Sequence, residues 1–254
     1  MKRIYIILIM LVCFIGGAQA QDMDGAFEKG NNLYTKGSYK AAAEQYQKII
    51  DAGYSSSKLF YNAGNAYYKQ KLYAKAILCY ERAYRLSPSD AAINHNLELA
   101  RLQIKDKVEP VPTFFVVEWL SAIRSWLSAN GWAWLSITSL LVCGLLFVAY
   151  RFTGTLITKK IAFSSSSFFM LLFLFSVWNA SVQTKKITEP NTAIVLSPVV
   201  VVKSSPDENG KELFIVHEGT KLTFTETPPV EGWTEVRIAD GNTGWIQNST
   251  FEII

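Results

Sequence analysis

Two long apolar segments in the middle of the chain constrain its fold more than any other feature. Residues Ala133 to Tyr150 and Ile161 to Ala180 contain 18 and 20 residues without a charged side chain. An α-helix rises about 1.5 Å per residue, so each segment is long enough to cross the roughly 30 Å hydrocarbon core of a bilayer. The ten residues between them include Arg151, Lys159 and Lys160 but no acidic residue. The pattern predicts a membrane hairpin whose two flanks lie on the same side of the membrane.

The start of the chain predicts export, which places the two flanks of the hairpin outside the cytoplasm. Lys2 and Arg3 precede an apolar run, and Ala18-Gln19-Ala20 fits a signal-peptide cleavage site. The alternative is an uncleaved N-terminal anchor, for which the apolar run is short. With a signal peptide over residues 1–20, the basic loop over 151–160 lies in the cytoplasm, as the positive-inside rule prefers. We expect a two-pass protein of a bacterial inner membrane, with N- and C-terminal domains in the periplasm.

A 34-residue repeat occupies the N-terminal block. The residues that recur at this offset are small or aromatic: Gly30, Tyr39, Ala42 and Tyr46 return as Gly64, Tyr73, Ala76 and Tyr80. This pattern, with Pro88 closing the second unit, resembles the tetratricopeptide repeat, a helix-turn-helix unit. Each such repeat needs a neighbour to bury its apolar face, and Asp90 is a candidate N-cap of a capping helix. We therefore expect an all-α array with its cap over residues 21–107.

The repeat resemblance implies a concave groove that holds a peptide or a helix of a partner. Four asparagines are candidate groove residues: Asn31, Asn62, Asn65 and Asn96. A carboxamide donates and accepts hydrogen bonds at once, so it can hold an extended peptide backbone. The alternative for each is a solvated side chain or a cap of local backbone. Phe27 and Ala92 stand where a carboxylate-clamping array would carry basic residues, which argues against a terminal-carboxylate clamp.

A proline linker and a tryptophan-rich segment over residues 108–132 lead to the first apolar span. Pro110 and Pro112 end the helical array because each removes a backbone donor. Beyond them, apolar and polar residues alternate at helical spacing, which predicts an amphipathic helix on the membrane surface. The alternative is a buried soluble helix. The tryptophans here are candidate membrane-interface anchors: Trp119, Trp126, Trp132 and Trp134.

Short alternating strands follow the second span, over residues 190–254. We predict them over residues 193–196, 199–203, 212–217, 221–225, 233–239 and 243–247. Asp240-Gly241 suits a type I′ hairpin turn, because both of its central residues need positive φ. About 60 residues of this form predict a small all-β barrel.

Parts of this block resemble bacterial SH3-like domains: Val199 to Pro206, Leu213 to Gly219, Gly232-Trp233 and Asp240 to Ile246. The resemblance implies that the barrel binds cell-wall peptides or protein segments. Trp233 and Trp245 are its candidate ligand-face residues, and packing of the barrel core is the alternative role for both.

The sequence offers no catalytic or metal site. It lacks a nucleophile motif, a phosphate-binding glycine loop and a recognisable carboxylate pair, so we predict a protein that is not an enzyme and has no cofactor. Cys79 lies in a predicted soluble helix and Cys143 in a predicted membrane helix. They therefore indicate neither a disulfide framework nor a set of metal ligands. His95 and His217 are interpreted as structural. Basic residues are scattered among acidic ones, which argues against nucleic-acid binding.

The order of the parts resembles the BatE family of bacterial aerotolerance-operon proteins over essentially the full chain. The parts include an array ending in Asn96-Leu97-Glu98-Leu99-Ala100-Arg101, the linker Pro110-Val111-Pro112, the hairpin and the SH3-like barrel. The resemblance implies an inner-membrane protein whose operon also encodes a MoxR-type ATPase and von Willebrand factor A membrane proteins. It also implies a link to oxidative-stress tolerance.

Together these features predict a non-enzymatic membrane adaptor. Its array captures a protein partner, such as a von Willebrand factor A-type protein and through it the MoxR-type ATPase, and its barrel binds a second partner or a wall peptide. The alternative is an envelope sensor whose barrel binds peptidoglycan peptides and whose repeats relay to a partner. A third hypothesis is an accessory subunit of a wall-processing enzyme.

Overall fold

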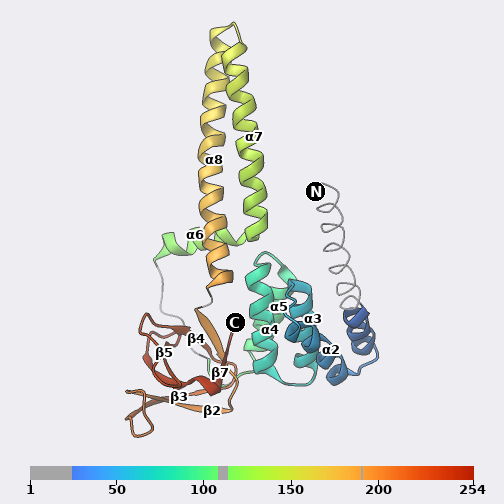
Figure 1. Cartoon of the computed structure of the whole chain (residues 1–254), viewed down its shortest axis with the longest axis vertical. Helices are drawn as coiled ribbons and strands as arrows, with labels where there is room; N and C mark the ends of the chain where they lie inside the picture. Colours follow the sequence, from blue (N-terminus) through green and yellow to red (C-terminus); the bar gives the residue numbers. More distant parts are fainter. Residues whose placement is uncertain (1–24, 108–113, 190) are drawn as a thin grey trace, which may run out of the picture.

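The structure, a computed structural model of the chain, describes residues 25–107, 114–189 and 191–254. It contains a helical array, a helical hairpin with a short helix across its base, and an antiparallel sheet. The hairpin rises above the array and the sheet, which lie side by side beneath it (Figure 1). The predicted signal peptide over residues 1–20 and the linker prolines Pro110 and Pro112 lie outside the described residues.

Helix pairs with the predicted 34-residue period form the array. Its helical segments are residues 25–35, α2 (Tyr39–Asp51), α3 (Ser57–Lys69), α4 (Tyr73–Leu86) and α5 (Ala91–Arg101). The predicted N-cap of α5 is confirmed, because the Asp90 carboxylate accepts a hydrogen bond from the Ala92 amide at 2.9 Å. Such a cap satisfies a backbone donor that has no partner inside the helix.

The repeated glycines and tyrosines form the close contact within each helix pair. Tyr46 and Tyr80 are each 1% exposed, and each ring lies against the glycine of the preceding helix. A Cβ atom built on Gly30 or Gly64 would lie 2.6 Å from the tyrosine ring. The two helices can therefore approach this closely only because a glycine stands at the crossing.

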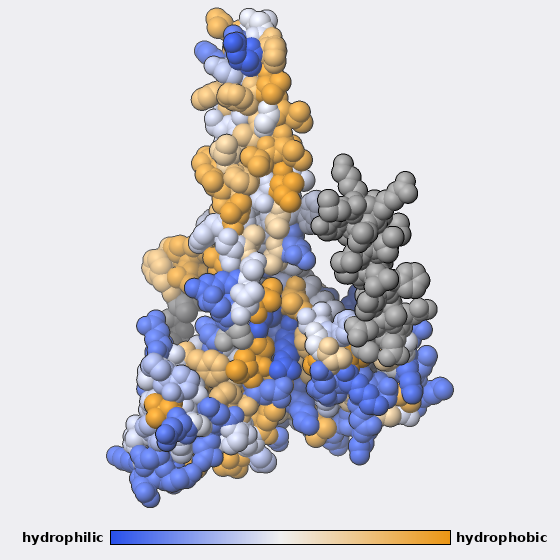
Figure 2. All heavy atoms as spheres, viewed as in Figure 1, coloured by the Kyte–Doolittle hydropathy of each residue, from blue (hydrophilic) through white to orange (hydrophobic). Residues whose placement is uncertain are grey.

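Two long antiparallel helices form the hairpin, α7 (Ala129–Phe152) and α8 (Leu156–Thr188). Both extend beyond the predicted spans of 133–150 and 161–180, and both are long and apolar enough to cross a membrane. Within their most apolar stretches, only 22% of α7 and 17% of α8 is buried. Apolar side chains cover the outside of the hairpin, and polar ones gather at its tip (Figure 2).

The contact between α7 and α8 is lined by small and polar residues. Those buried there are Ser136, Ser139, Cys143, Ala162, Ser166 and Ser176. The Ser166 hydroxyl donates to the main-chain oxygen of Cys143 at 3.2 Å. Small residues let helix backbones approach closely, which is the usual packing of helices in lipid. Ser166 therefore packs inside the hairpin, against α7.

A short helix, α6 (Phe115–Ser125), crosses the base of the hairpin (Figure 1). No residue of α6 is buried, so the alternative of a buried soluble helix is wrong. Its C-terminal end is held by the hairpin. The Trp132 indole donates to the main-chain oxygen of Arg124 at 3.0 Å, and the Gln183 carboxamide donates to that of Leu127 at 2.7 Å.

The C-terminal block is one antiparallel sheet in the order β3-β2-β6-β5-β4-β1-β7. Its strands are β1 (Thr192–Val195), β2 (Val199–Lys203), β3 (Glu212–His217), β4 (Lys221–Phe224), β5 (Trp233–Arg237), β6 (Thr243–Gln247) and β7 (Phe251–Ile253). The six predicted strands are confirmed to within two residues, and β7 was not predicted. Alternate side chains such as Val200, Val202, Val236 and Ile246 form its core.

The turn between β5 and β6 differs from the predicted type I′ turn. Gly241 has a φ of 93°, but Asp240 is not among the residues with positive φ. The Gly241 amide donates to the main-chain oxygen of Ile238 at 3.0 Å, and the Ile238 amide donates to that of Asn242 at 3.0 Å. This is the longer hairpin loop in which a single glycine takes the left-handed position.

We predict that Gly64→Ala destabilises the array by about 1–3 kcal/mol, because the added methyl group forces the Tyr80 ring out of its packed position. The matched control is Gly25→Ala, where nothing lies within 4 Å of the added atom. Thermal unfolding of the two variants of the full chain in detergent, followed by circular dichroism, measures the difference. Equal melting temperatures would show that the glycine is not required for the helix crossing.

Candidate functional site

The four candidate groove asparagines form two equivalent hydrogen-bond sets along the array. The Asn31 Oδ1 atom accepts from the Tyr46 hydroxyl at 2.8 Å and from the Asn62 carboxamide at 2.9 Å. The equivalent residues 34 positions later repeat the arrangement: Asn65 Oδ1 accepts from Tyr80 at 2.7 Å and from Asn96 at 2.8 Å. The asparagines therefore join the first helices of successive repeats, a role that neither of our sequence-based alternatives described.

Each set keeps unused hydrogen-bonding capacity. Among the hydrogen bonds of the described residues, the side-chain nitrogens of Asn31 and Asn65 have no acceptor, and the side-chain oxygens of Asn62 and Asn96 have no donor. All four side chains are partly exposed. Donors and acceptors therefore remain available along the array, and their positions are fixed by the bonds already made.

Two adjoining hollows lie over these asparagines and share Tyr34 and Asn65. The first has a volume of about 150 Å³ and also contacts Asn31, Tyr46 and Asn62. The second has a volume of about 320 Å³, and its walls are largely tyrosine rings: Tyr34, Tyr61, Tyr68 and Tyr80. Lys69 is the one charged residue among the described residues lining either hollow. We call the two hollows together the repeat groove.

Burial keeps the tyrosine hydroxyls of the repeat groove protonated. Desolvation raises the pKa of Tyr46 to about 12, and it raises the pKa of Tyr80 as well. Both hydroxyls therefore remain hydrogen-bond donors at neutral pH, and both donate to an asparagine oxygen. The repeat groove presents a neutral polar floor whose donors and acceptors do not change with physiological pH.

The candidate ligand-face tryptophans lie on the side of the sheet opposite its core. In the β5–β6 register, Glu235 pairs with Trp245 and Trp233 pairs with Gln247, so both rings share one face. Trp233 is 9% exposed, and the ammonium group of Lys203 lies 6.0 Å from its ring centroid. Trp245 is partly exposed. Neither lines the repeat groove.

A larger hollow of about 600 Å³ lies on the sheet beside α4. Phe224 and Phe251 form part of its wall, with ring centroids 5.6 Å apart, and Arg82 contributes from α4. Sequence reasoning missed it because Phe251 belongs to β7, a three-residue strand without a clear alternating pattern. We call this the sheet hollow.

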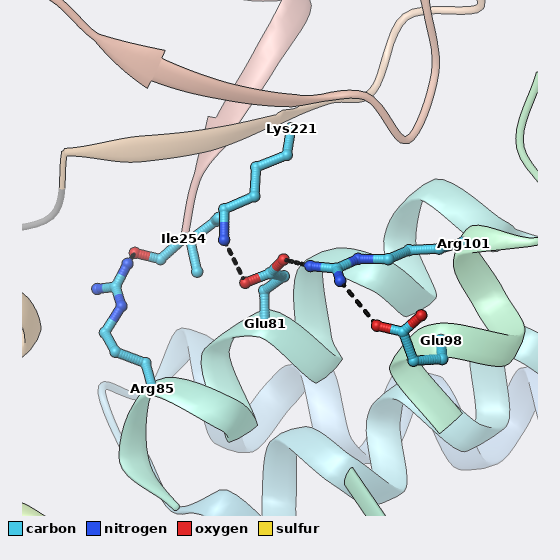
Figure 3. Close-up of polar contacts among 6 residues, drawn as sticks. All are labelled: Glu81, Arg85, Glu98, Arg101, Lys221 and Ile254. Carbon is cyan, nitrogen blue, oxygen red and sulfur yellow. Dashed lines mark hydrogen bonds and ion pairs between the residues drawn. The ribbon is translucent and has the colours of Figure 1, made fainter. Parts of the chain in front are cut away.

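The array and the sheet are joined directly through a buried carboxylate (Figure 3). Glu81 in α4 is 3% exposed, and it pairs with the Lys221 ammonium at 2.7 Å and with the Arg101 guanidinium at 2.6 Å. Burial alone would raise the pKa of Glu81, but these two cations hold it below its usual value. Lys221 begins β4 and Arg101 ends α5, so Glu81 links the sheet to the capping helix.

A second link follows the end of α5. The Asp106 carboxylate accepts hydrogen bonds from the His217 amide at 2.6 Å, from the His217 ring at 2.7 Å and from the Thr220 hydroxyl at 2.7 Å. Beside it, Ile104 packs against Gly219, where an added Cβ would lie 2.5 Å from an Ile104 methyl group. The structural role assigned to His217 from sequence is thus a contact between the array and the sheet.

Apolar side chains complete this junction. Ile77 and Ala100 of the array share one buried cluster with Ile194 and Ile254 of the sheet. The sequence predicted two modules brought together only by the hairpin. In the structure they also pack on one another, and the sheet covers the end of the array.

The candidate interface tryptophans divide into two groups. Trp119, Trp126 and Trp134 are 64%, 69% and 68% exposed around the base of the hairpin. Trp132 differs from the expectation, because it is 4% exposed and packs edge-on against Phe175 with ring centroids 5.8 Å apart. Its indole nitrogen bonds to α6, so Trp132 fixes that helix rather than facing outward.

Reactive side chains are not gathered at any of these places. Within residues 25–107, 114–189 and 191–254, no three His, Cys, Asp or Glu side chains are placed to hold a metal ion. Cys79 is buried in α4, and desolvation raises the pKa of its thiol to about 12. That thiol is therefore not activated as a nucleophile. His95 is exposed on α5.

Comparison with known families agrees with the helix pairing. Residues 27–91 match the tetratricopeptide repeat family. That range covers both helix pairs from the third residue of the first helix onward, and it ends at the start of α5. No curated protein matches the chain. The chain thus carries tetratricopeptide repeats, a module that binds other proteins.

We predict that Asp106→Asn loosens the junction between array and sheet. Burial alone would raise the pKa of Asp106, but its three hydrogen bonds lower it below the ordinary value of 3.8. Hydrogen exchange of the His217 and Thr220 amides should accelerate about tenfold, since about 1.4 kcal/mol changes an equilibrium tenfold. The control is Glu226→Gln, an exposed carboxylate with no hydrogen bond among those of the described residues.

The contact at Asp106 should also make the stability of the junction depend on pH, with a loss of stability in acid. Because its pKa is lowered in the docked state, Asp106 stabilises the junction fully above the ordinary pKa of 3.8. The contribution declines as the pH falls below that value and disappears once the docked carboxylate is protonated. In the Asp106→Asn variant this part of the acid response should be absent. An identical response in both proteins would contradict the role of Asp106.

Proposed function

We propose that the protein is a non-enzymatic membrane adaptor whose repeat groove captures an extended segment of a protein partner. The observation that carries this proposal is the set of unused donors and acceptors on Asn31, Asn62, Asn65 and Asn96. An extended peptide presents amide donors and carbonyl acceptors at regular spacing, and side-chain carboxamides complement both. Because the asparagines are already held in place, little side-chain entropy is lost on binding.

The lining of the groove indicates the chemistry of the segment. Tyrosine rings offer large, stiff apolar surfaces with a polar tip, and such residues are enriched where proteins bind peptides. Lys69 supplies the one positive charge among the described residues of the lining. A neutral or weakly acidic segment with apolar or aromatic side chains therefore fits better than a strongly charged one.

The hairpin supports the proposal that the chain is inserted in a membrane. Its outward residues form a large apolar surface, whereas soluble monomers rarely expose a contiguous apolar patch beyond a few hundred Å². We infer that α7 and α8 cross the bilayer and that α6 lies at its surface with Phe115 and Trp119 in the headgroup region. Arg151, Lys159 and Lys160 near the hairpin tip then lie in the cytoplasm, and the array and sheet in the periplasm.

The resemblance to the BatE family suggests the partners. A Bat-type complex of a bacterial inner membrane includes von Willebrand factor A-type membrane proteins, and these are the partners we propose for the repeat groove. The MoxR-type ATPase would then be reached indirectly, and the role would be in oxidative-stress tolerance. The sheet, which we interpret as an SH3-like barrel, would bind a second partner or a wall peptide.

An envelope sensor is the second candidate, and the junction between array and sheet favours it. Arg82 of α4 lines the sheet hollow and also pairs with Glu252 of β7 at 2.8 Å. A peptidoglycan peptide in the sheet hollow would contact the same arginine. Ligand binding on the sheet would in this way act on a helix of the array.

We predict that photo-crosslinking residues at Thr35 and Leu99 capture a partner in cells. Both positions line the repeat groove and are exposed. Lys40, exposed on α2 and outside the groove lining, is the control. Products from the two groove positions, read by mass spectrometry, should be at least severalfold more abundant than from Lys40. Equal yields from all three positions would contradict the groove proposal. A yield from the groove positions that changes when peptidoglycan fragments are added would favour the envelope sensor.

We predict opposite labelling of two introduced cysteines by a membrane-impermeant maleimide. In intact spheroplasts Asn209→Cys, in the β2–β3 turn, should be labelled, and Thr155→Cys, at the hairpin tip, should not. Both positions are exposed, and the described native cysteines, Cys79 and Cys143, are buried. Both variants should be labelled after lysis. Labelling of Thr155→Cys in intact spheroplasts would contradict the proposed topology.

A further inference from the structure

A basic hollow of about 240 Å³ lies where the array, the hairpin base and the sheet meet. Its cations come from different elements: Arg85 from α4, Arg124 from α6, Lys186 from α8 and Lys221 from β4. Glu81 is the one acidic side chain among the described residues that line it. We call it the junction hollow. Nothing in the sequence predicts it, because its residues lie far apart along the chain.

The single carboxylate does not neutralise these cations. Glu81 pairs with Lys221 and also with Arg101, which lies outside the lining. Among the described residues, the partners of the Arg124 guanidinium are neutral: Asn179 at 3.4 Å and the Trp178 ring, whose centroid is 5.2 Å away. Within the described parts of the chain, no Asp or Glu side chain forms an ion pair with Arg124 or Lys186.

These positive charges are close enough to repel one another. Arg124, Lys186 and Lys221 line the same hollow of about 240 Å³, so their charges lie near one another. Arg85 is partly buried and donates to the main-chain oxygen of Ile254 (Figure 3). Holding like charges together in a partly enclosed space is unfavourable unless an anion offsets them. A phosphate group suits such a site, since arginine guanidinium groups bind phosphate oxygens through paired hydrogen bonds.

The junction hollow lies at the level where a headgroup would be. Residues of α6 and of the last turns of α8 line it. These two segments lie at the base of the hairpin (Figure 1), below its apolar part (Figure 2). Exposed aromatic side chains of α6, including Phe115 and Trp119, mark the same level. Basic pockets between helices at a membrane surface are the usual sites of anionic lipid headgroups.

We propose that the junction hollow binds the phosphate group of an anionic phospholipid from the leaflet around α6. This inference rests on the proposed crossing of the membrane by α7 and α8. The bound headgroup contacts cations from α4, α6, α8 and β4 at once. It therefore fixes the array and the sheet against the membrane surface, and the orientation of the repeat groove depends on the lipid composition of the bilayer.

Native mass spectrometry of the full chain, released from nanodiscs that contain phosphatidylcholine and phosphatidylglycerol in equal amounts, tests the proposal. The wild-type protein should retain phosphatidylglycerol in at least fivefold excess over phosphatidylcholine. The double variant Arg124→Gln/Lys186→Gln should lose this preference. The control Lys159→Gln/Lys160→Gln removes the same charge at the hairpin tip, and it should keep the preference. Equal retention by all three proteins would overturn the proposal.

Two further measurements separate the remaining explanations. Hydrogen exchange of the His217 amide shows whether the double variant keeps the docked fold, because that amide bonds to Asp106 outside the junction hollow. Inorganic phosphate at millimolar concentration should not displace the lipid, and displacement would identify a free anion as the ligand instead. Crosslinks from Leu99 report on the repeat groove independently, so a failure of lipid binding is distinct from a failure of the adaptor.

Discussion

The pairing of buried Glu81 with Lys221 and Arg101 is the interaction on which the arrangement of the array and the sheet depends. A carboxylate that is 3% exposed is costly unless its charge is compensated. One compensating cation comes from the sheet and the other from the capping helix. Removing either element would leave the carboxylate with half of its partners. Docking of the sheet and capping of the repeats therefore stabilise one another.

The junction also solves a problem that short repeat arrays share. Each repeat exposes apolar surface that a neighbour must cover, so an array of two repeats has much of its surface at its ends. α5 covers one side of the last repeat, and the sheet covers more of it through Ile194 and Ile254. The close contact between Gly219 and Ile104 shows how tightly the sheet and the array fit together. The C-terminal sheet is thus part of the fold of the array.

The sequence predicts the elements well where the signal is local and periodic. Gly30 and Gly64, or Tyr46 and Tyr80, recur at a fixed offset because each pair makes the same contact. The junction has no such signal, because Glu81 and Lys221 lie 140 residues apart and Asp106 and His217 lie 111 apart. Other features were missed although a pattern was present. Trp132 shares the spacing of Ser136, Ser139 and Cys143, which marks the buried face of α7.

The candidate site was only partly predictable for a related reason. The asparagines could be named from the sequence, and Asn31 and Asn62 recur 34 residues later as Asn65 and Asn96. Their bonds to each other depend on how neighbouring helices stack, which the period alone does not give. Phe251, in the sheet hollow, and Arg124, in the junction hollow, belong to sites made by distant segments. Such sites are visible only once those segments are placed.

Direct packing changes how the proposed adaptor would work. Two modules on flexible tethers gain from a raised effective concentration, and the gain depends on tether length. Here the array and the sheet are held in one orientation by Glu81 and Asp106, so a partner must match that orientation to contact both. A relay from sheet to array requires a second arrangement that a ligand prefers. Arg82 lines the sheet hollow and also pairs with Glu252. A second arrangement would therefore have to differ from the present one in the contacts between α4 and the sheet.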